Sequence, residues 1–272
     1  MTNSGFYQNK LALITGASSG IGRAISVQLL KRGARIIAVG RDQNKLDTLQ
    51  HENSGQFKER VETIRADLAD PEGVTDLLEH LETRESEGRI NILVNNAGVG
   101  CFGPFNEHSW QTYQEMMQLN MSTLTRLTLH FSSEMRAQKE GAILNIASMA
   151  GISPVPDFSV YAATKAYVYS FSQALHYELK PYGIRVTVVN PGPTPTRFFD
   201  RAGKKVSEKK LSRMVSPEIV ARKALKGLES NKLQVYPGWM DKILHKLNAL
   251  SPHHISMPVS DFYMKKKTQS GI

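Results

Sequence analysis

Short apolar runs alternate with amphipathic stretches along most of the chain, and this alternation restricts the possible folds more than any other feature. The runs are rich in β-branched residues and apolar on both sides, as strands in the interior of a parallel sheet are. Between them, apolar residues recur with the period of a helix. Seven strands are predicted, over residues 10–15, 35–40, 61–66, 90–95, 142–147, 184–190 and 233–237. Helices are predicted over residues 21–32, 43–51, 72–84, 109–138, 159–180 and 217–230.

This order favours the α/β class: a single doubly wound, Rossmann-like domain with right-handed crossovers. The 272 residues contain no internal repeat and suffice for one such domain. We expect a seven-stranded parallel sheet flanked by helices within residues 1–237, followed by a short basic C-terminal extension over 238–272. Segment 193–216 is long and rich in proline and charge, so we expect it to cover a substrate site.

The single cysteine, Cys101, excludes a disulfide framework and favours a reducing compartment. The N-terminus lacks the basic start and apolar run of a signal peptide. No apolar stretch approaches the roughly 18 residues that a membrane-spanning helix needs. A cytoplasmic protein is therefore predicted.

The net charge of +9 is concentrated near the C-terminus. Residues 201–272 hold 15 Lys and Arg against 5 Asp and Glu, whereas residues 1–200 hold 19 against 20. This basic segment could bind an acidic acyl carrier, the phosphates of coenzyme A or an anionic membrane. Binding to a membrane would be a peripheral association. The segment could equally be a solvated surface without a partner. Nucleic acid is not expected, because aromatic residues are not interleaved with the basic ones.

The stretch "TGASSGIG" (15–22) directly follows the first predicted strand and opens the first helix. Its glycines, Gly16, Gly20 and Gly22, permit a sharp turn and a close approach of a pyrophosphate to the helix N-terminus. An ordinary tight turn is the alternative, but the strand–turn–helix context favours dinucleotide binding. A Walker-type phosphate loop is excluded, because no Gly-Lys-Ser/Thr follows.

Cofactor preference is predicted from the end of the second strand. Proteins that prefer NAD place a carboxylate there for the ribose 2′-hydroxyl. This chain has Gly40 and Arg41, and a guanidinium binds a 2′-phosphate well. Asp42 precedes a helical pattern and fits an N-cap. NADP is therefore the predicted cofactor, with a solvated surface arginine as the alternative for Arg41.

Catalytic residues are predicted in "YAATK" (161–165), where Tyr161 and Lys165 stand four apart on a helix and share a face. Reduction of a carbonyl needs a proton donor at its oxygen. The tyrosine pKa of about 10 is high for this task, and a nearby ammonium lowers it. Ser148 ends the fifth strand at the same sheet edge and could hold the substrate oxygen.

Taken in order along residues 8–237, the motifs resemble those of the short-chain dehydrogenase/reductase family. They are "TGASSGIG", "ADL" (66–68), "NNAG" (95–98), "QLNMST" (118–123), Ser148, "YAATK" and "NPGPTPT" (190–196). The stretches "GVGCFGPF" and "ASMAG" further resemble those of the branch that contains 3-oxoacyl and 17β-hydroxysteroid type reductases.

The resemblance implies roles for individual residues. Tyr161 would be the acid/base, Lys165 would tune its pKa and bind the nicotinamide ribose, and Ser148 would orient the substrate. Asn120 would hold a helix irregularity and a water of a proton relay. Predicted cofactor-binding residues are Gly16, Ser18, Ser19, Gly20, Ile21, Arg41, Asp67, Leu68, Asn95, Ala97, Tyr161, Lys165, Pro191, Gly192, Thr194 and Thr196. For Asn95 a structural role is favoured over contact with the chemistry.

The predicted function is hydride transfer between NADP(H) and a carbonyl or secondary alcohol, most simply the reduction of a hydrophobic ketone. Ser148, Phe102, Met149 and Phe198 are the predicted substrate residues, and Phe105 and Phe199 are apolar candidates for the pocket wall. No metal is expected, because no acidic or cysteine partner is found at ligand spacing around His108, His176, His253 and His254. The resemblance implies a homodimer or homotetramer.

Two alternatives remain open. One is a sugar-nucleotide epimerase or dehydratase, which shares the Tyr/Lys pair but has a different glycine spacing and a larger C-terminal substrate domain. The other is a non-catalytic NADP(H)-binding or docking protein, against which the intact catalytic set argues.

Overall fold

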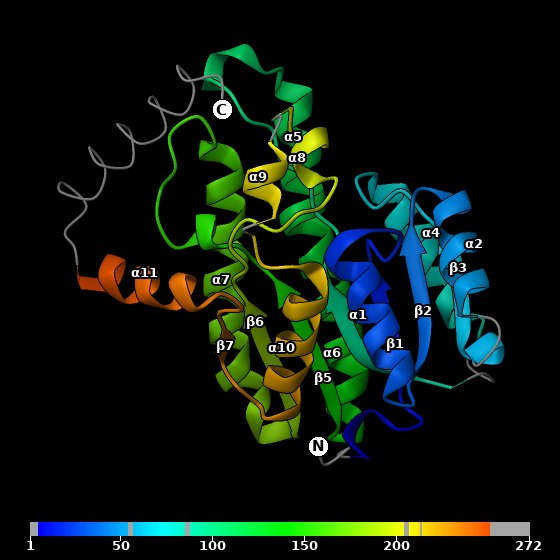
Figure 1. Ribbon diagram of the computed structural model, residues 1–272. Coiled ribbons are helices and arrows are strands. Elements are labelled where there is room, and N and C mark those ends of the chain that lie inside the picture. The colour runs from blue at the N-terminus through cyan, green and yellow to red at the C-terminus, as the bar shows by residue number, and fades with distance from the viewer. Residues whose placement is uncertain (1–4, 54–56, 85–87, 204–206, 213, 251–272) are drawn as a thin grey trace.

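Seven parallel strands form one sheet in the computed structural model, in the order β3-β2-β1-β4-β5-β6-β7 (Figure 1). The structure describes residues 5–53, 57–84, 88–203, 207–212 and 214–250. The strands are β1 (Leu11–Thr15), β2 (Arg35–Gly40), β3 (Val61–Arg65), β4 (Ile90–Asn95), β5 (Gly141–Ile146), β6 (Ile184–Val189) and β7 (Gln234–Val235). The predicted sheet and the position of every predicted strand are confirmed.

Both faces of this sheet are buried, which explains why its strands read as continuous apolar runs. All five residues of β1 are buried. Its side chains alternate between two cores: Ala12 and Ile14 belong to one, Leu11 and Leu13 to the other. Each core needs its own layer of helices, as in doubly wound folds.

Helices cover the sheet on both sides (Figure 1). One layer, packed on the first core, consists of α1 (Gly20–Lys31), α2 (Gln43–Glu52) and α10 (Pro217–Glu229). The other consists of α4 (Pro71–Glu82), α6 (Leu124–Gln138) and α7 (Ser159–Leu179). Because the chain runs outward from β1 to β3 and then returns to β4, the strand order reverses beside β1. Ligands of doubly wound folds bind at the carboxyl ends of the strands near such a reversal.

The predicted helix over 109–138 is interrupted. It consists of α5 (Trp110–Met117), a π-helical turn over Gln118–Thr123, and α6. A π turn inserts an extra residue into the helix and is frequent at functional sites. Short 3-10 turns lie at Gly5–Tyr7, Lys58–Arg60, Phe105–Glu107, Met149–Gly151 and Lys180–Tyr182.

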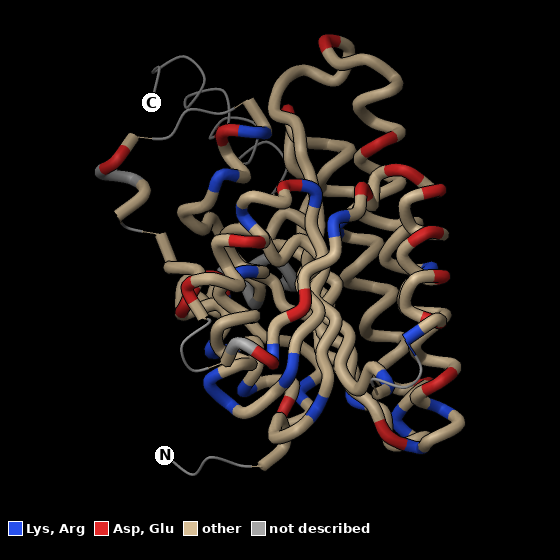
Figure 2. The backbone as a smooth tube through the Cα atoms, turned by 90° about the vertical axis from the view of Figure 1, so that its right-hand side faces the viewer, with Lys and Arg blue, Asp and Glu red and all other residues tan. Residues whose placement is uncertain are grey.

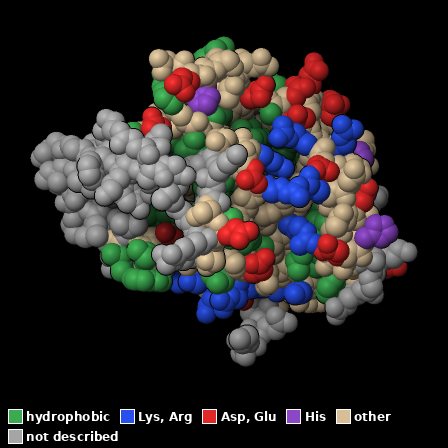
Figure 3. All heavy atoms as spheres, turned by 45° about the horizontal axis from the view of Figure 1, so that its top comes forward, with side chains coloured by type: hydrophobic (Ala, Val, Ile, Leu, Met, Phe, Trp, Pro, Cys, Tyr) green, Lys and Arg blue, Asp and Glu red, His purple; other side chains and the backbone are tan. Residues whose placement is uncertain are grey.

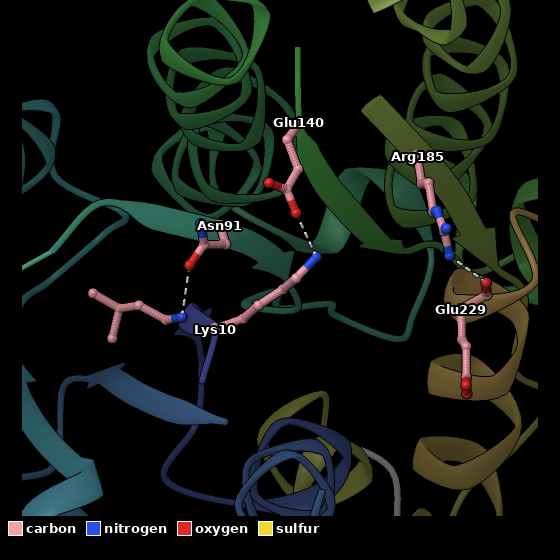
Figure 4. A network of polar contacts seen from close by, with 6 residues as sticks. Lys10, Asn91, Glu140, Arg185 and Glu229 are labelled. Carbon is pink, nitrogen blue, oxygen red and sulfur yellow. Dashed lines mark hydrogen bonds and ion pairs between the residues drawn. The ribbon is translucent and has the colours of Figure 1, made fainter. Parts of the chain in front are cut away.

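Polar side chains fasten the amino ends of the strands (Figure 4). Lys10 Nζ donates to Glu140 Oε1 over 2.9 Å, and Asn91 Oδ1 accepts from the backbone N–H of Leu11 over 2.9 Å. The Arg185 guanidinium donates to the carbonyl of Glu229. Charged residues are frequent at this end of the molecule and along the helices (Figure 2). The polar side chains at the opposite, carboxyl edge of the sheet are available to form the functional site.

Beyond β6 the chain forms α8 (Phe198–Arg201), α9 (Glu208–Leu211), α10, β7 and α11 (Trp239–Leu250), which projects from the body (Figure 1). Residues 251–272 of the predicted extension, and residues 204–206 of segment 193–216, lie outside the described residues. Within the described ranges, no helix combines the length and the apolar character needed to cross a bilayer.

Candidate active site

The glycine turn after β1 leaves its backbone uncovered. Gly16 and Gly20 have φ angles of 65° and 56°, in the left-handed region that glycine adopts without strain. A Cβ atom on Gly16 would lie 3.0 Å from the Cα of Ala97, and one on Gly20 would lie 2.9 Å from Thr196 Cγ2. Side chains at these positions would therefore disrupt both the turn and its contact with segment 193–216.

The N-terminus of α1 has no side-chain cap, because the extended Ser19 makes no capping hydrogen bond. In contrast, α2 is capped by Asp42, which accepts from Lys45 N over 3.2 Å as predicted. An uncapped helix N-terminus presents free N–H groups and a positive dipole to an anion.

A cleft of about 720 Å³ opens beside this turn. Ser18, Ser19, Gly20 and Thr196 line it, as predicted for cofactor contacts. Arg23 and Lys45 line it as well, although they were not predicted. Figure 3, which brings the carboxyl edge forward, shows Lys and Arg side chains gathered among acidic ones on this face. Uncovered backbone, a free helix N-terminus and nearby cations fit the phosphates of NADP(H).

Asn96 and Thr15 brace the glycine turn, and neither was singled out from the sequence. Asn96 Nδ2 donates to the carbonyls of Thr15 (2.9 Å) and Gly16 (3.2 Å). Thr15 Oγ1 accepts from the backbone N–H groups of Asn96 and Ala97, each over 3.0 Å. Their proximity follows from the pairing of β1 with β4, which the sequence pattern alone does not specify.

The side chain of Asn95, a residue predicted among the cofactor contacts, lies in the interior. It is 3% exposed and donates to Thr128 Oγ1 and Asn145 Oδ1, each over 2.9 Å. Alternation along β4 turns this side chain into the interior, where it links α6 to β5. The structural role favoured for Asn95 is the one that the contacts support.

Arg41 and Asp67 face each other at the ends of β2 and β3. The distance from Arg41 Nη1 to Asp67 Oδ2 is 3.7 Å, and both side chains are half exposed. Asp67 Oδ1 accepts from Ala69 N over 3.0 Å. Next to them, Leu68 is buried, and its carbonyl accepts from Thr123 Oγ1 over 2.7 Å. Arg41 thus lies at the strand end where a 2′-phosphate is expected, paired with the residue expected to meet the adenine.

Tyr161 and Lys165 occupy consecutive turns of α7 and are 7% and 4% exposed. Lys165 Nζ donates to the carbonyl of Ile146, at the end of β5, over 2.9 Å and lies 5.8 Å from the centre of the Tyr161 ring. Ser148, two residues beyond β5, caps the turn Met149–Gly151 by accepting from Ala150 N. The strand end and the helix therefore bring all three residues to one place.

Burial shifts the pKa values of Tyr161 and Lys165 in opposite directions and so moves them apart. Burial raises the pKa of Tyr161 to about 12, partly offset by hydrogen bonding with Ser148. Burial lowers the pKa of Lys165 to about 8. The expected lowering of the Tyr161 pKa by Lys165 is therefore not found in this state, because desolvation of the phenolate is the dominant effect. At neutral pH the phenol holds its proton, as a proton donor must.

Asn120 lies in the π turn and ties three segments together. Its Nδ2 donates to the carbonyl of Val99 (2.9 Å) and to Thr164 Oγ1 (3.0 Å), and its Oδ1 accepts from Val99 N (3.0 Å). A Cβ on Gly98 would lie 3.1 Å from Asn120 Oδ1 and 3.2 Å from Lys165 Nζ. The predicted helix irregularity at Asn120 is present, and its amide faces the same small space as Lys165.

Aromatic rings enclose Tyr161. Phe158 stacks on it at 4.2 Å between ring centres, and Phe102 stacks on Phe158 at 3.7 Å. Phe198 lies 5.2 Å from Tyr161 on the remaining side. Phe102 and Phe198 thus lie where predicted, whereas Phe158 was missed because a lone aromatic before a helix resembles a core residue.

Two other candidates for the pocket wall lie elsewhere. Phe105 is 65% exposed and stacks on Tyr113, so it does not border Tyr161. Phe199 lines the cofactor cleft instead. Met149 remains near the site, because its N–H donates to the carbonyl of Pro191 over 3.0 Å.

Segment 193–216 approaches the site from β6. The carbonyl of Ala202 accepts from Phe102 N over 2.9 Å, which joins this segment to the loop after β4. At its beginning, Thr194 is buried and donates to the carbonyl of Gly192 over 3.1 Å.

Of the remaining predicted contacts, Ile21 packs against the first core. Within the described part of the chain, no group of three His, Cys, Asp or Glu side chains could hold a metal ion.

Residues 10–207 match the model of the short chain dehydrogenase family. Very-long-chain 3-oxoacyl-CoA reductase of Macaca fascicularis is 32% identical over 84% of this chain and 73% of that protein. 17-beta-hydroxysteroid dehydrogenase type 3 of Mus musculus is 36% identical over 66% of this chain and 58% of that protein. A short-chain dehydrogenase from Sphingobium yanoikuyae in complex with NADPH superposes with a TM-score of 0.77 at 34% identity, over 89% of this chain and 94% of that one.

The chain therefore belongs to the short chain dehydrogenase family and is an oxidoreductase with a Rossmann-like, nucleotide-binding fold.

Proposed function

We propose that this oxidoreductase uses NADPH to reduce a bulky, hydrophobic ketone to a secondary alcohol. The observation that carries the proposal is the setting of Tyr161, whose protonated phenol lies beside Ser148 and Lys165 within a wall formed by Phe102, Phe158 and Phe198. A proton donor placed against apolar rings suits a carbonyl that carries large apolar substituents.

In the proposed reaction, the Ser148 hydroxyl binds the carbonyl oxygen and the Tyr161 hydroxyl donates a proton to it. The bound cofactor supplies the hydride. Lys165, held by the carbonyl of Ile146, stabilises the resulting phenolate through its positive charge. Asn120 keeps the π turn and the backbone at Val99 in place, next to the space that a proton relay through Lys165 requires.

The preference for NADPH rests on cations at two places. Arg41 directly follows β2, whose last residue, Gly40, provides no carboxylate, and Arg23 and Lys45 line the adjacent cleft. Their guanidinium and ammonium groups favour a cofactor with an additional phosphate. The NADPH bound by the Sphingobium yanoikuyae relative is consistent with this choice.

The substrate class follows from the aromatic wall and from the names of the relatives, which include a 3-oxoacyl-CoA reductase and a hydroxysteroid dehydrogenase. We propose that the substrate is a 3-oxoacyl or steroid-like ketone. We also propose that the active form is a homodimer or homotetramer. The basic C-terminal quarter of the chain, residues 201–272, would meet an anionic surface that carries the substrate.

The test is the oxidation of NADPH, and separately of NADH, with 3-oxoacyl-CoA substrates of increasing chain length, a 17-oxosteroid and a small neutral ketone. The proposal predicts that kcat/KM rises with the apolar size of the ketone and is higher with NADPH. Binding of NADPH without turnover of any ketone would favour the non-catalytic alternative.

A further inference from the structure

The terminal helix α11 is mounted with its apolar side outward. Trp239, Met240 and Ile243 are 73%, 57% and 48% exposed. In contrast, Asp241 is 9% exposed. An amphipathic helix on a protein surface normally buries its apolar stripe and exposes its polar one, so this orientation is the reverse of the usual one.

Specific contacts set this orientation. The Asp241 carboxylate accepts from the backbone N–H groups of Gly192 (3.2 Å) and Gly238 (3.1 Å). A Cβ on either glycine would collide with this carboxylate, so both positions admit it only because they lack a side chain. One turn later, the His245 ring stacks on Tyr236 with 4.6 Å between centres. The polar side of α11 is therefore fixed to the body.

Trp239 and Ile243 stand four positions apart, and residues at this spacing share one side of a helix. Exposed tryptophan and aliphatic side chains on one helical side are typical of helices that lie in the interface of a bilayer.

Basic side chains are exposed on α11 and on α10, which α11 follows. Lys242 is exposed and directly precedes Ile243. Lys223 Nζ donates to the carbonyl of Pro237 over 2.6 Å and so joins α10 to the start of α11. Arg222 and Lys226 are exposed on α10 next to Lys223. Cations next to an apolar patch attract the anionic headgroups of lipids. If two copies of the chain paired across a two-fold axis, the cations of the two patches would face and repel each other.

We propose that α11 binds the surface of an anionic lipid bilayer, with Trp239, Met240 and Ile243 inserted among the lipids and the neighbouring cations at the headgroups. The proposal goes beyond the catalytic function, because it depends only on this helix and its surroundings. It also commits the basic C-terminal part of the chain to a lipid surface rather than to a carrier protein.

The experiment uses the full chain with the substitution Trp110→Phe, which leaves Trp239 as its single tryptophan. Its emission is recorded with phosphatidylcholine vesicles and with vesicles that contain about one third phosphatidylglycerol. The proposal predicts a blue shift and co-sedimentation with the anionic vesicles, both reversed when salt is raised from about 0.05 M to about 0.5 M.

A triple variant, Trp239→Ser/Met240→Ser/Ile243→Ser, should lower sedimentation with anionic vesicles at least about tenfold. Trp110→Ser is the matched control, since Trp110 is 69% exposed on another helix, and it should sediment like the parent.

Three results would overturn the proposal. The first is unchanged Trp239 emission with anionic vesicles. The second is equal sedimentation of the triple variant and the parent. The third is a blue-shifted Trp239 without lipid, which would mean that a second copy or another part of the chain covers α11. None of these measures ketone reduction, so failure here is distinguishable from failure of the proposed function.

Discussion

The carboxylate of Asp241 accepts a hydrogen bond from the backbone N–H of Gly192 over 3.2 Å, so that a side chain of α11 holds the loop that follows β6. Gly192 belongs to "NPGPTPT", in which Pro191, Gly192, Thr194 and Thr196 are predicted to bind the cofactor. In the same loop, the carbonyl of Pro191 accepts from Met149 N, next to Ser148. The terminal helix is thereby connected to the catalytic residues through one buried carboxylate.

Asp241→Ala should weaken this connection. It removes the acceptor for the N–H groups of Gly192 and Gly238, and each hydrogen bond to a charged group contributes roughly 1.5–3 kcal/mol. We expect a loss of about 2–4 kcal/mol in the free energy of unfolding and a raised KM for NADPH. Asp241→Asn retains an acceptor oxygen and should recover most of both. Equal behaviour of the Ala variant and the parent in urea unfolding and cofactor titration would contradict this role.

Cofactor preference should respond to charge at the end of β2. Gly40→Asp combined with Arg41→Ala introduces a carboxylate and removes the guanidinium, so the ratio of kcat/KM for NADPH to that for NADH should fall about 10–100-fold. Gly40→Ala is the matched control. It adds a Cβ 3.2 Å from Ser18 Oγ without a charge and should keep the ratio. An unchanged ratio in the double variant would show that Arg41 does not contact the 2′-phosphate.

Burial of Lys165 should make stability depend on pH. Its pKa is about 8 in the folded protein and 10.5 in the absence of burial, so between these values the unfolded state binds more protons. The free energy of unfolding therefore rises with pH in this window, whereas below about pH 8 the full penalty of the buried charge is present. Relative to that of Lys165→Met, the free energy of unfolding of the cofactor-free parent should rise by about 3 kcal/mol between pH 8 and 10.5.

Urea unfolding of both proteins across this range measures the difference. The exposed Lys180→Met serves as the control and should follow the parent. A constant difference between parent and Lys165→Met from pH 7.5 to 10.5 would contradict the proposed burial of the ammonium.

Self-association should depend on the outer side of α6 and α7. Leu129 and Tyr177 are 68% and 65% exposed there, and exposed apolar patches mark sites of protein–protein contact. Light scattering of the parent should give a multiple of 30.3 kDa, and Leu129→Lys/Tyr177→Lys should shift it toward the monomer. Ile219→Lys, on α10, should leave the mass unchanged. A monomeric parent at micromolar concentration would contradict the expectation.

Much of this architecture is predictable because the strands are buried on both faces. Runs of apolar, β-branched residues of this kind fit the interior of a sheet that is covered on both faces. The order of strands and helices then places Gly16, Ser148 and Tyr161 at one edge of the sheet. The cap at Asp42 is likewise local chemistry, since its carboxylate needs only the N–H of Lys45. Such features depend on neighbours in the sequence or on the order of the strands.

The sequence is least informative about features that depend on which way a side chain points. Asn95 follows the alternation of β4 into the interior, and Phe158 stacks on Tyr161 because of a turn that the sequence does not specify. The orientation of α11 could not be predicted, because a helical pattern reveals two sides without showing which one meets the protein. The orientation is decided by Asp241, whose carboxylate needs glycine both at position 192, far away in the sequence, and at position 238, three residues earlier.

We propose Tyr161 as the proton donor of ketone reduction, and a comparison of Tyr161→Phe with the parent tests this role most directly. NADPH affinity should stay close to that of the parent while kcat for ketone reduction falls about 10²–10⁴-fold, because the ring is retained and the proton is lost. Tyr167→Phe, on the same helix and 37% exposed, should keep its kcat. More than about a tenth of the parent kcat in Tyr161→Phe would contradict the assignment.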